Sequence, residues 1–278
     1  MFCFQCEQAA KGTGCDTMGV CGKKPGVSNL QDVVVHQLKG IGYLGRQARK
    51  LGIVDSDIDR HVVEALFSTV TNVDFDFERL EKLVRRGHEL KIRLRATYLA
   101  AARNAGRPVD ETTLPAAVSF VPADTDDELV GQGDETGVLA GPANEDIRSL
   151  QQLLTYGLKG MSAYADHALL LGKTDETVMA FFHEALAALN RVDPSIEELV
   201  ALNMRCGQVN VRTMEILDEA HTGRFGHPEP TTVPTGLQAG PAIVVSGHDL
   251  LDLEALLQQT EGTGVKVYTH GEMLPAHG

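Results

Sequence analysis

The sequence contains no tryptophan, and aromatic residues make up only 5% of its 278 residues. Few flat rings are therefore available as stacking platforms for unpaired bases. Clustered positive charge is also lacking, because the net charge is −13 and phosphate binding needs groups of Lys and Arg. These two shortages argue against nucleic acid as a partner.

Long apolar runs are missing as well. No stretch approaches the ~20 apolar residues that a membrane-spanning helix needs, and the N-terminus has no basic segment followed by an apolar one. We therefore expect a cytoplasmic protein with no membrane partner. In a reducing compartment, five cysteines of which four lie in the first 21 residues indicate metal binding rather than disulfides.

The pattern of apolar residues divides the chain into four parts. Residues 1–27 form a loop rich in cysteine and glycine, and residues 28–222 have the apolar spacing of helices. Residues 223–241, rich in proline and glycine, predict a linker, and residues 242–278 predict an incomplete α/β domain. The expected fold class is a mainly α N-terminal domain followed by the start of an α/β, Rossmann-like domain.

Helical spacing predicts two groups of helices, with Ser28 as the N-cap of the first helix. Residues 107–143 contain four prolines and an acidic stretch, and they predict a long irregular connection between the groups. The helices are expected at about 28–52, 57–72, 77–104, 145–171, 174–190 and 195–220.

The two groups of helices resemble each other. A shift of 120 residues places Leu-Lys-Gly at 38–40 on Leu-Lys-Gly at 158–160, and Glu-Ala-Leu at 64–66 on Glu-Ala-Leu at 184–186, without a gap. Chance agreement between two Ala/Leu-rich segments is the alternative, but the ungapped blocks favour a duplicated three-helix unit and hence two three-helix bundles. The repeat units are expected at about 28–106 and 145–221.

Four cysteines with the spacing x2, x8, x5 are the strongest chemical signal: Cys3, Cys6, Cys15 and Cys21. Four thiolates are the ligand set of an iron–sulfur cube, and the glycines between them let the backbone direct N–H groups at sulfur. A structural zinc site is the alternative, although the spacing lacks the two Cys-x2-Cys pairs of a zinc ribbon. The fifth cysteine, Cys206, lies in a predicted helix, where we expect a buried apolar role.

A second candidate site lies near the C-terminus. Short apolar runs at 242–245 and 265–268 flank a helix that Asp249 caps, which predicts a βαβ unit with parallel strands. His248 and Glu272 follow the two strands, so they are expected at the same edge of the sheet. Imidazole and carboxylate are good iron ligands, but spacing alone favours two ordinary surface residues.

Several motifs resemble the hybrid cluster protein family, which includes the prismane proteins and the hydroxylamine reductases. The resemblance extends over essentially the whole chain. It rests on the opening Met-Phe-Cys-Phe-Gln-Cys-Glu-Gln, on the segments that contain Cys15 and Cys21, and on residues 156–168, 245–250 and 261–278.

The resemblance implies a 4Fe-4S cluster on the four cysteines. It also implies a second, hybrid 4Fe-2O-2S cluster, to which His248 and Glu272 correspond as the histidine and the first glutamate ligand. The implied reaction is the reduction of a small nitrogen-oxide substrate: hydroxylamine to ammonia and water, with nitric oxide as a further substrate. Electrons would enter through the 4Fe-4S cluster from a donor that the resemblance does not identify.

Members of that family are about twice as long, and their remaining hybrid-cluster ligands lie beyond the position of Gly278. We therefore expect a truncated half of an oxidoreductase, inactive by itself unless a second chain supplies the other half. Two alternatives stay open at this point. One is a non-catalytic iron–sulfur electron-transfer or partner module, and the other is a zinc-stabilised structural domain.

Overall fold

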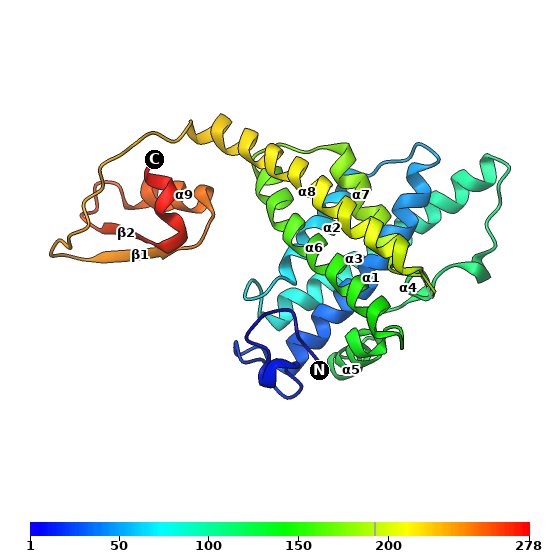
Figure 1. Cartoon of the computed structure of the whole chain (residues 1–278). Coiled ribbons are helices and arrows are strands. Elements are labelled where there is room, and N and C mark those ends of the chain that lie inside the picture. Colours follow the sequence, from blue (N-terminus) through cyan, green and yellow to red (C-terminus); the bar gives the residue numbers. More distant parts are fainter. Residues whose placement is uncertain (192) are drawn as a thin grey trace. The chain divides into compact units, whose positions relative to one another are not determined.

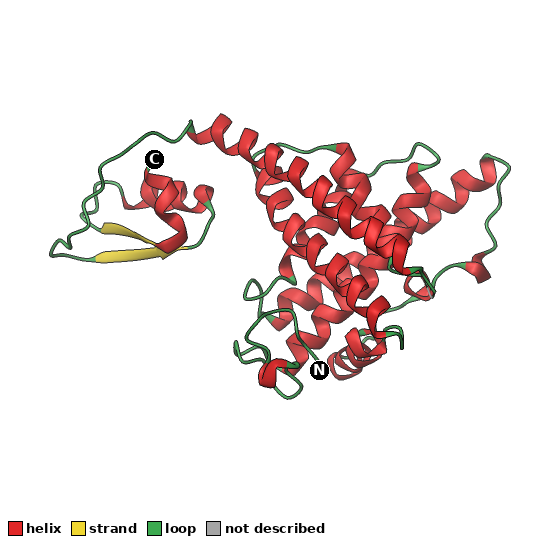
Figure 2. Ribbon diagram, viewed as in Figure 1, coloured by secondary structure: helices red, strands yellow, loops and turns green. Residues whose placement is uncertain are grey.

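The computed structural model describes residues 1–191 and 193–278, which form two compact units, Met1–Leu217 and Asp218–Gly278. The described chain is mainly helical and contains one small two-stranded parallel sheet (Figure 2). This confirms the predicted mainly α character followed by a short α/β segment.

The first unit is built mainly from helices (Figure 1). The last of these helices, α8, continues past the boundary into the second unit. The helices are α1 (Pro25–Arg49), α2 (Ser56–Ser68), α3 (Phe77–Asn104), α4 (Ala116–Ser119), α5 (Asp126–Thr136), α6 (Glu145–Leu170), α7 (Glu176–Ala188) and α8 (Ile196–Phe225).

The prediction that Ser28 caps the first helix is wrong. Helix α1 begins at Pro25, with Lys24 in the extended N-cap position and Ser28 buried in the first turn. Proline is well suited to the first helical position, because its fixed φ is helical and its missing N–H would have no partner there. The helix therefore starts one turn earlier than the Ser28 prediction implies.

The connection at 107–143 is more ordered than predicted, because it contains α4 and α5. Three acidic residues occupy the first turn of α5, where their negative charges stabilise the helix by interacting with the positive end of its dipole. Asn29 Nδ2 donates to the Val130 carbonyl at 3.0 Å, which ties α5 to α1. Lys91 Nζ, on α3, donates to the carbonyls of Ala117 and Phe120 at 3.0 and 2.5 Å and holds the end of α4.

Helix α1 lies at the centre of the first unit, where it packs against α3, α4, α5 and α7. Its buried apolar positions include Leu38, Ile41 and Leu44. Glycines allow neighbouring segments to come close: a Cβ at Gly40 would lie 2.6 Å from the Ala117 carbonyl carbon. Helix α1 thus contributes to the packing of most of the other helices of the unit.

Equivalent polar caps recur 120 residues apart. The Asp55 carboxylate accepts the first amides of α2 at 3.1 and 3.3 Å, and the Asp175 carboxylate does the same for α7 at 2.8 and 3.4 Å. Both helices have 13 residues. Gly52 and Gly172 precede these caps with φ of +76° and +77°, a conformation that favours glycine.

The second unit contains the predicted βαβ arrangement. Strand β1 (Ala242–Ser246) leads through α9 (Leu250–Thr260) to β2 (Lys266–His270), and the two strands pair in parallel. The Asp249 carboxylate accepts the Asp252 amide at 3.0 Å, which confirms the predicted cap. A 3-10 helix follows β2 over 271–277.

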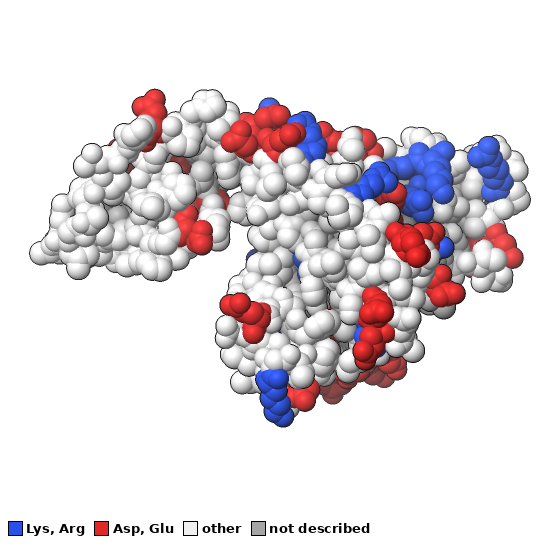
Figure 3. All heavy atoms as spheres, in the orientation of Figure 1, with Lys and Arg blue, Asp and Glu red and all other residues white. Residues whose placement is uncertain are grey.

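Several exposed charged side chains of the first unit lie in ion pairs. In Figure 3 basic side chains gather near the ends of α1 and α3, and acidic side chains are scattered over the rest of the visible face. Two arginines of α3 have acidic partners: Arg93 lies 2.9 Å from Asp55, and Arg95 pairs with Glu111. No helix of the described residues has the length and apolar character that a bilayer crossing requires.

Candidate functional site

The N-terminal loop is closed by an antiparallel bridge between two of the four cysteines. Cys3 N donates to Cys15 O at 3.0 Å, and Cys15 N donates to Cys3 O at 2.8 Å. Cys15 is buried, Cys3 and Cys6 are half-buried, and Cys21 is exposed. The backbone therefore brings the first and third cysteines opposite each other, although they are 12 residues apart.

The surroundings of the sulfur atoms suit thiolates. The Ala10 amide donates to Cys15 Sγ at 3.4 Å, an N–H···S contact of the kind that tunes bound clusters. A Cβ at Gly19 would lie 3.0 Å from Cys21 Sγ, so the glycine lets the backbone approach that sulfur. None of the five cysteines, all of which lie in the described chain, forms a disulfide.

The structure does not gather the four sulfur atoms into a finished site. Within the described ranges, no three His, Cys, Asp or Glu side chains lie close enough together to hold a metal ion. The donor set nevertheless fits an iron–sulfur cluster in its chemistry, because it offers four free thiols with a backbone amide and glycines beside them.

Two lysines hold the cysteine loop against the helices. Lys159, on α6, donates to Gln5 Oε1 and to the Thr69 carbonyl, both at 3.2 Å. Lys23 is buried and donates to Gln31 Oε1 at 2.6 Å. Burial lowers the pKa of Lys159 to about 8, against the opposing effects of Asp32 and Cys3. The role of Lys159 was not predicted, because its partners lie 154 and 90 residues away in the sequence.

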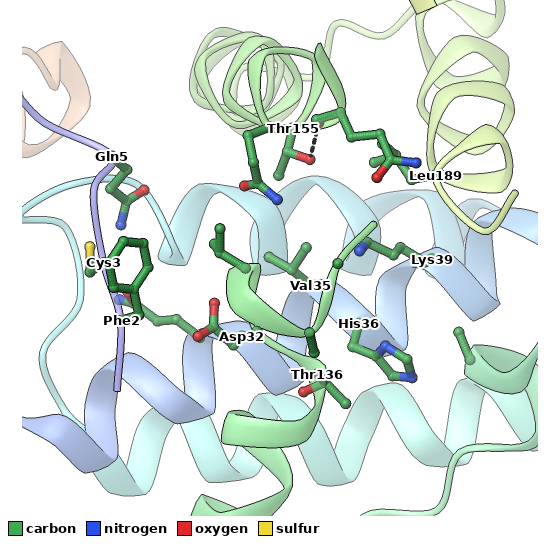
Figure 4. Close-up of a pocket in the computed structure, with 18 of the residues that line it drawn as sticks. Phe2, Cys3, Gln5, Asp32, Val35, His36, Lys39, Thr136, Thr155 and Leu189 are labelled. Carbon is green, nitrogen blue, oxygen red and sulfur yellow. Dashed lines mark hydrogen bonds between the residues drawn. The ribbon is translucent and has the colours of Figure 1, made fainter. Parts of the chain in front are cut away.

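A cavity of about 510 Å³ lies beside this loop in the first unit (Figure 4). Phe2, Cys3 and Gln5 lie at one end, and Lys39 lies at the other. Asp32, from α1, lies between them, and burial raises its pKa to about 7 although Lys159, Lys23 and Lys39 act in the opposite direction. Sequence patterns gave no indication of this cavity, because the connection around 135–142 forms part of its wall.

The structure brings His248 and Glu272 together. Their Nε2 and Oε2 atoms are 3.5 Å apart, and both side chains are largely exposed, at 70% and 73%. The strand register explains the contact, because Ser246 pairs with His270 and the two residues stand at equal distances beyond that pair. The expectation that the residues after the two parallel strands lie at the same edge of the sheet is thus confirmed.

Two donors do not fit a multi-iron cluster by themselves. Such a group needs several protein ligands and a shell that limits water, whereas His248 and Glu272 are exposed and the described residues supply no third ligand beside them. The structure therefore shows a contact between the two side chains and no complete ligand set for a cluster among the described residues.

Cys206 is the buried apolar residue that the sequence predicts. It is 5% exposed on α8, and a Cβ at Gly157 of α6 would lie 2.9 Å from its sulfur. Burial raises the pKa of its thiol to about 11, which disfavours the thiolate that metal binding needs. Cys206 is therefore a packing residue between α6 and α8.

Comparison with known proteins gives the same family as the motifs. The profile described as "Prismane/CO dehydrogenase family" matches residues 1–278. A protein named hydroxylamine reductase from Geobacter metallireducens is 50% identical over 100% of this chain and 51% of its own length. Proteins of the same name from Syntrophobacter fumaroxidans and Halothermothrix orenii are 51% and 47% identical, again over 100% of this chain and 50% of their own length. The chain thus spans about half the length of the curated relatives it matches.

Proposed function

The chain belongs to the prismane/CO dehydrogenase family, and from that premise we propose that it forms the electron-entry half of a hydroxylamine reductase. In this proposal Cys3, Cys6, Cys15 and Cys21 hold a 4Fe-4S cluster. His248 and Glu272 are two of the ligands of a hybrid 4Fe-2O-2S cluster. The relatives of that name, at about 50% identity, support the reaction class.

The observation that carries the proposal is the cysteine loop. Its bridge between Cys3 and Cys15 brings two thiols to the same side of a glycine-rich segment, and the Ala10 amide already donates to one sulfur. Four thiolates concentrate negative charge, and the buried ammonium groups of Lys23 and Lys159 lie in the adjoining cavity wall, where they oppose that charge.

The bound clusters would supply electron transfer and an open metal position, which side chains cannot provide. The reaction itself consumes two electrons and two protons: the N–O bond of hydroxylamine breaks, and ammonia and water form. In this proposal the work of the chain is to bind the thiolates, to hold their charge next to Lys159, and to present His248 and Glu272 at one edge of the sheet.

The test is iron per chain and the spectrum of the reduced protein after anaerobic purification. We expect about four irons per chain and the signal of a reduced cube. Cys15→Ser should remove both. Cys206→Ser is the matched control and should keep both, because the Cys206 thiol packs between α6 and α8. A colourless protein that binds zinc with the same cysteines would contradict the proposal.

A specific observation favours a second candidate, a non-catalytic iron–sulfur electron-transfer or partner module. The pair His248–Glu272 has no third ligand among the described residues. Turnover of hydroxylamine by the cluster-loaded chain with a chemical reductant separates the two functions. Turnover that His248→Ala abolishes would support the enzyme, and a reducible cube without turnover, even with a second chain carrying the other ligands, would support the module.

We also propose that the helical part arose by duplication, with repeat units at about 28–106 and 145–221 and two three-helix bundles. The matching Asp55 and Asp175 caps and the equal lengths of α2 and α7 support this. In the same proposal, residues 1–27 are the cluster loop, 28–222 the helical domain, 223–241 a linker and 242–278 the start of a Rossmann-like domain. The cytoplasmic location stays a prediction.

A further inference from the structure

The end of the cavity away from the cysteine loop has no part in the function proposed above. Three successive turns of α1 contribute Asp32, His36 and Lys39 to its wall, and Lys39 lies farthest from Cys3 (Figure 4). The facing wall comes from α6 and from the turn after α7, through Gln151, Thr155 and Leu189. Asn190 Nδ2 donates to the Lys39 carbonyl at 2.8 Å, which holds that turn against α1.

Two hydrogen-bond donors in this wall are unused. Gln151 is only 8% exposed, and its Nε2 atom is buried without a hydrogen-bond partner. Lys39 makes no hydrogen bond or ion pair through its ammonium group with any residue that the structure describes. A buried donor normally has a partner, and leaving the Gln151 amide without one costs about 1–3 kcal/mol. Lys39 is half-buried, so its ammonium group faces the cavity without a protein partner. The pair therefore indicates an acceptor that binds in the cavity.

The charges around the cavity also favour an anion. Lys23, Lys39 and Lys159 line it, against the carboxyl groups of Asp32 and Glu135. Burial raises the pKa of Asp32 to about 7, so its negative charge is only partly present at neutral pH. Burial also lowers the pKa of Lys39, and a bound anion would favour the charged form of that ammonium group. Two further residues of the wall add little, because burial lowers the pKa of His36 to about 4 and Arg191 is paired with Glu198 at 2.8 Å.

We propose that the Lys39 end of this cavity binds a small oxyanion, either an organic carboxylate or a nitrogen oxyanion. Its oxygens would accept hydrogen bonds from Lys39 Nζ and Gln151 Nε2, as charge-assisted bonds to carboxylate or nitrate do. A volume of about 510 Å³ leaves room for a short apolar part beside Val35 and Leu189. This site does not depend on a bound cluster.

Titration calorimetry of the whole chain tests the site, with sodium acetate and sodium nitrate as probes and sodium chloride at equal ionic strength as the reference. We expect one saturable site for at least one of the two probes. Lys39→Met should weaken binding by about tenfold or more, because it removes a charged hydrogen-bond donor. Lys82→Met, on the exposed surface of α3, is the matched control and should leave the affinity unchanged.

Asp32→Asn gives an effect of the opposite sign. Removal of its negative charge should tighten binding severalfold at pH 8, where the native carboxyl group is mostly ionised. This variant keeps the test decisive if Lys39→Met fails to fold. Binding of acetate alone would identify an organic acid as the ligand class, and binding of nitrate would identify a nitrogen oxyanion. Absence of saturable binding for both probes, or the same affinity in Asp32→Asn as in the parent chain, would overturn the proposal.

Discussion

Two glycines at the same position of the repeated Leu-Lys-Gly tripeptide should respond to alanine with opposite signs. Gly40 lies on α1 beneath α4, where a Cβ would overlap the backbone of Ala117. Gly160 lies exposed on α6, and a Cβ there would meet no atom within 4 Å. The two substitutions are chemically identical, so their difference isolates the packing of α4 on α1.

The expected magnitudes follow from two opposing effects. Alanine in place of glycine stabilises a helix interior by about 1 kcal/mol, and at Gly160 nothing opposes this gain. At Gly40 the obstacle is backbone rather than a flexible side chain, so a cost of about 3 kcal/mol is expected, at the upper end for overpacking. Gly40→Ala should therefore lower the free energy of unfolding by about 2 kcal/mol, and Gly160→Ala should raise it by about 1 kcal/mol.

Urea unfolding of both variants, followed by helical circular dichroism, measures these differences. The displaced segment also includes the carbonyls that accept from Lys91, so the Gly40→Ala variant should lose protection from proteolysis in 115–125. Equal midpoints for the two variants, or stabilisation by Gly40→Ala, would refute the close approach of α4 to α1.

Three further predictions concern charge and domain structure. Asp32 keeps a proton in the folded state that the unfolded chain loses above about pH 4. The free energy of unfolding therefore falls as the pH rises from about 4 to about 7. The charged groups that face Asp32 are Lys23, Lys39, Lys159 and the N-terminus. Asp32→Asn should therefore raise the free energy of unfolding by about 2 kcal/mol at pH 8 and change it little at pH 4, and equal gains at both values would contradict this. Asp59 accepts from His183 and Arg49, both at 2.7 Å, so Asp59→Asn should cost about 2 kcal/mol in urea unfolding, with exposed Asp146→Asn as the control. A chain ending at Phe225 should retain cooperative helical unfolding, because the first unit ends within α8; a broad, protease-sensitive transition would argue against an independent unit.

Helix positions were predictable where local signals agree. Helix α3 runs from Phe77 to Asn104 as expected, because Asp76 caps its start and Gly106 provides the left-handed turn after its end. The start of α1 was placed too late, because Ser28 is a good N-cap in isolation while Pro25 begins the helix. Helix α5 was missed because proline density around it indicates a loop, although its acidic first turn favours a helix.

The candidate site residues also fall into those that local sequence signals predict and those that depend on long-range contacts. Spacing within 21 residues was enough to propose Cys3, Cys6, Cys15 and Cys21, and parallel pairing was enough to expect contact between the residues after the two strands. The cavity depends instead on contacts between segments more than 100 residues apart, such as α1 with the turn after α7. Composition and periodicity have no information about such contacts, so Lys39, Gln151 and Asp32 could be found only in the folded chain.

The register of the two strands has a consequence for how much change the second unit tolerates. His248 and Glu272 stand two residues beyond the pair Ser246–His270, so their separation depends on the spacing between neighbouring strands and on two short exits. The separation of His248 and Glu272 does not depend on the length of α9 or of the turn at 261–264. Residues can therefore be inserted into that crossover without moving the imidazole away from the carboxylate, whereas a single residue added between Ser246 and His248 would separate them.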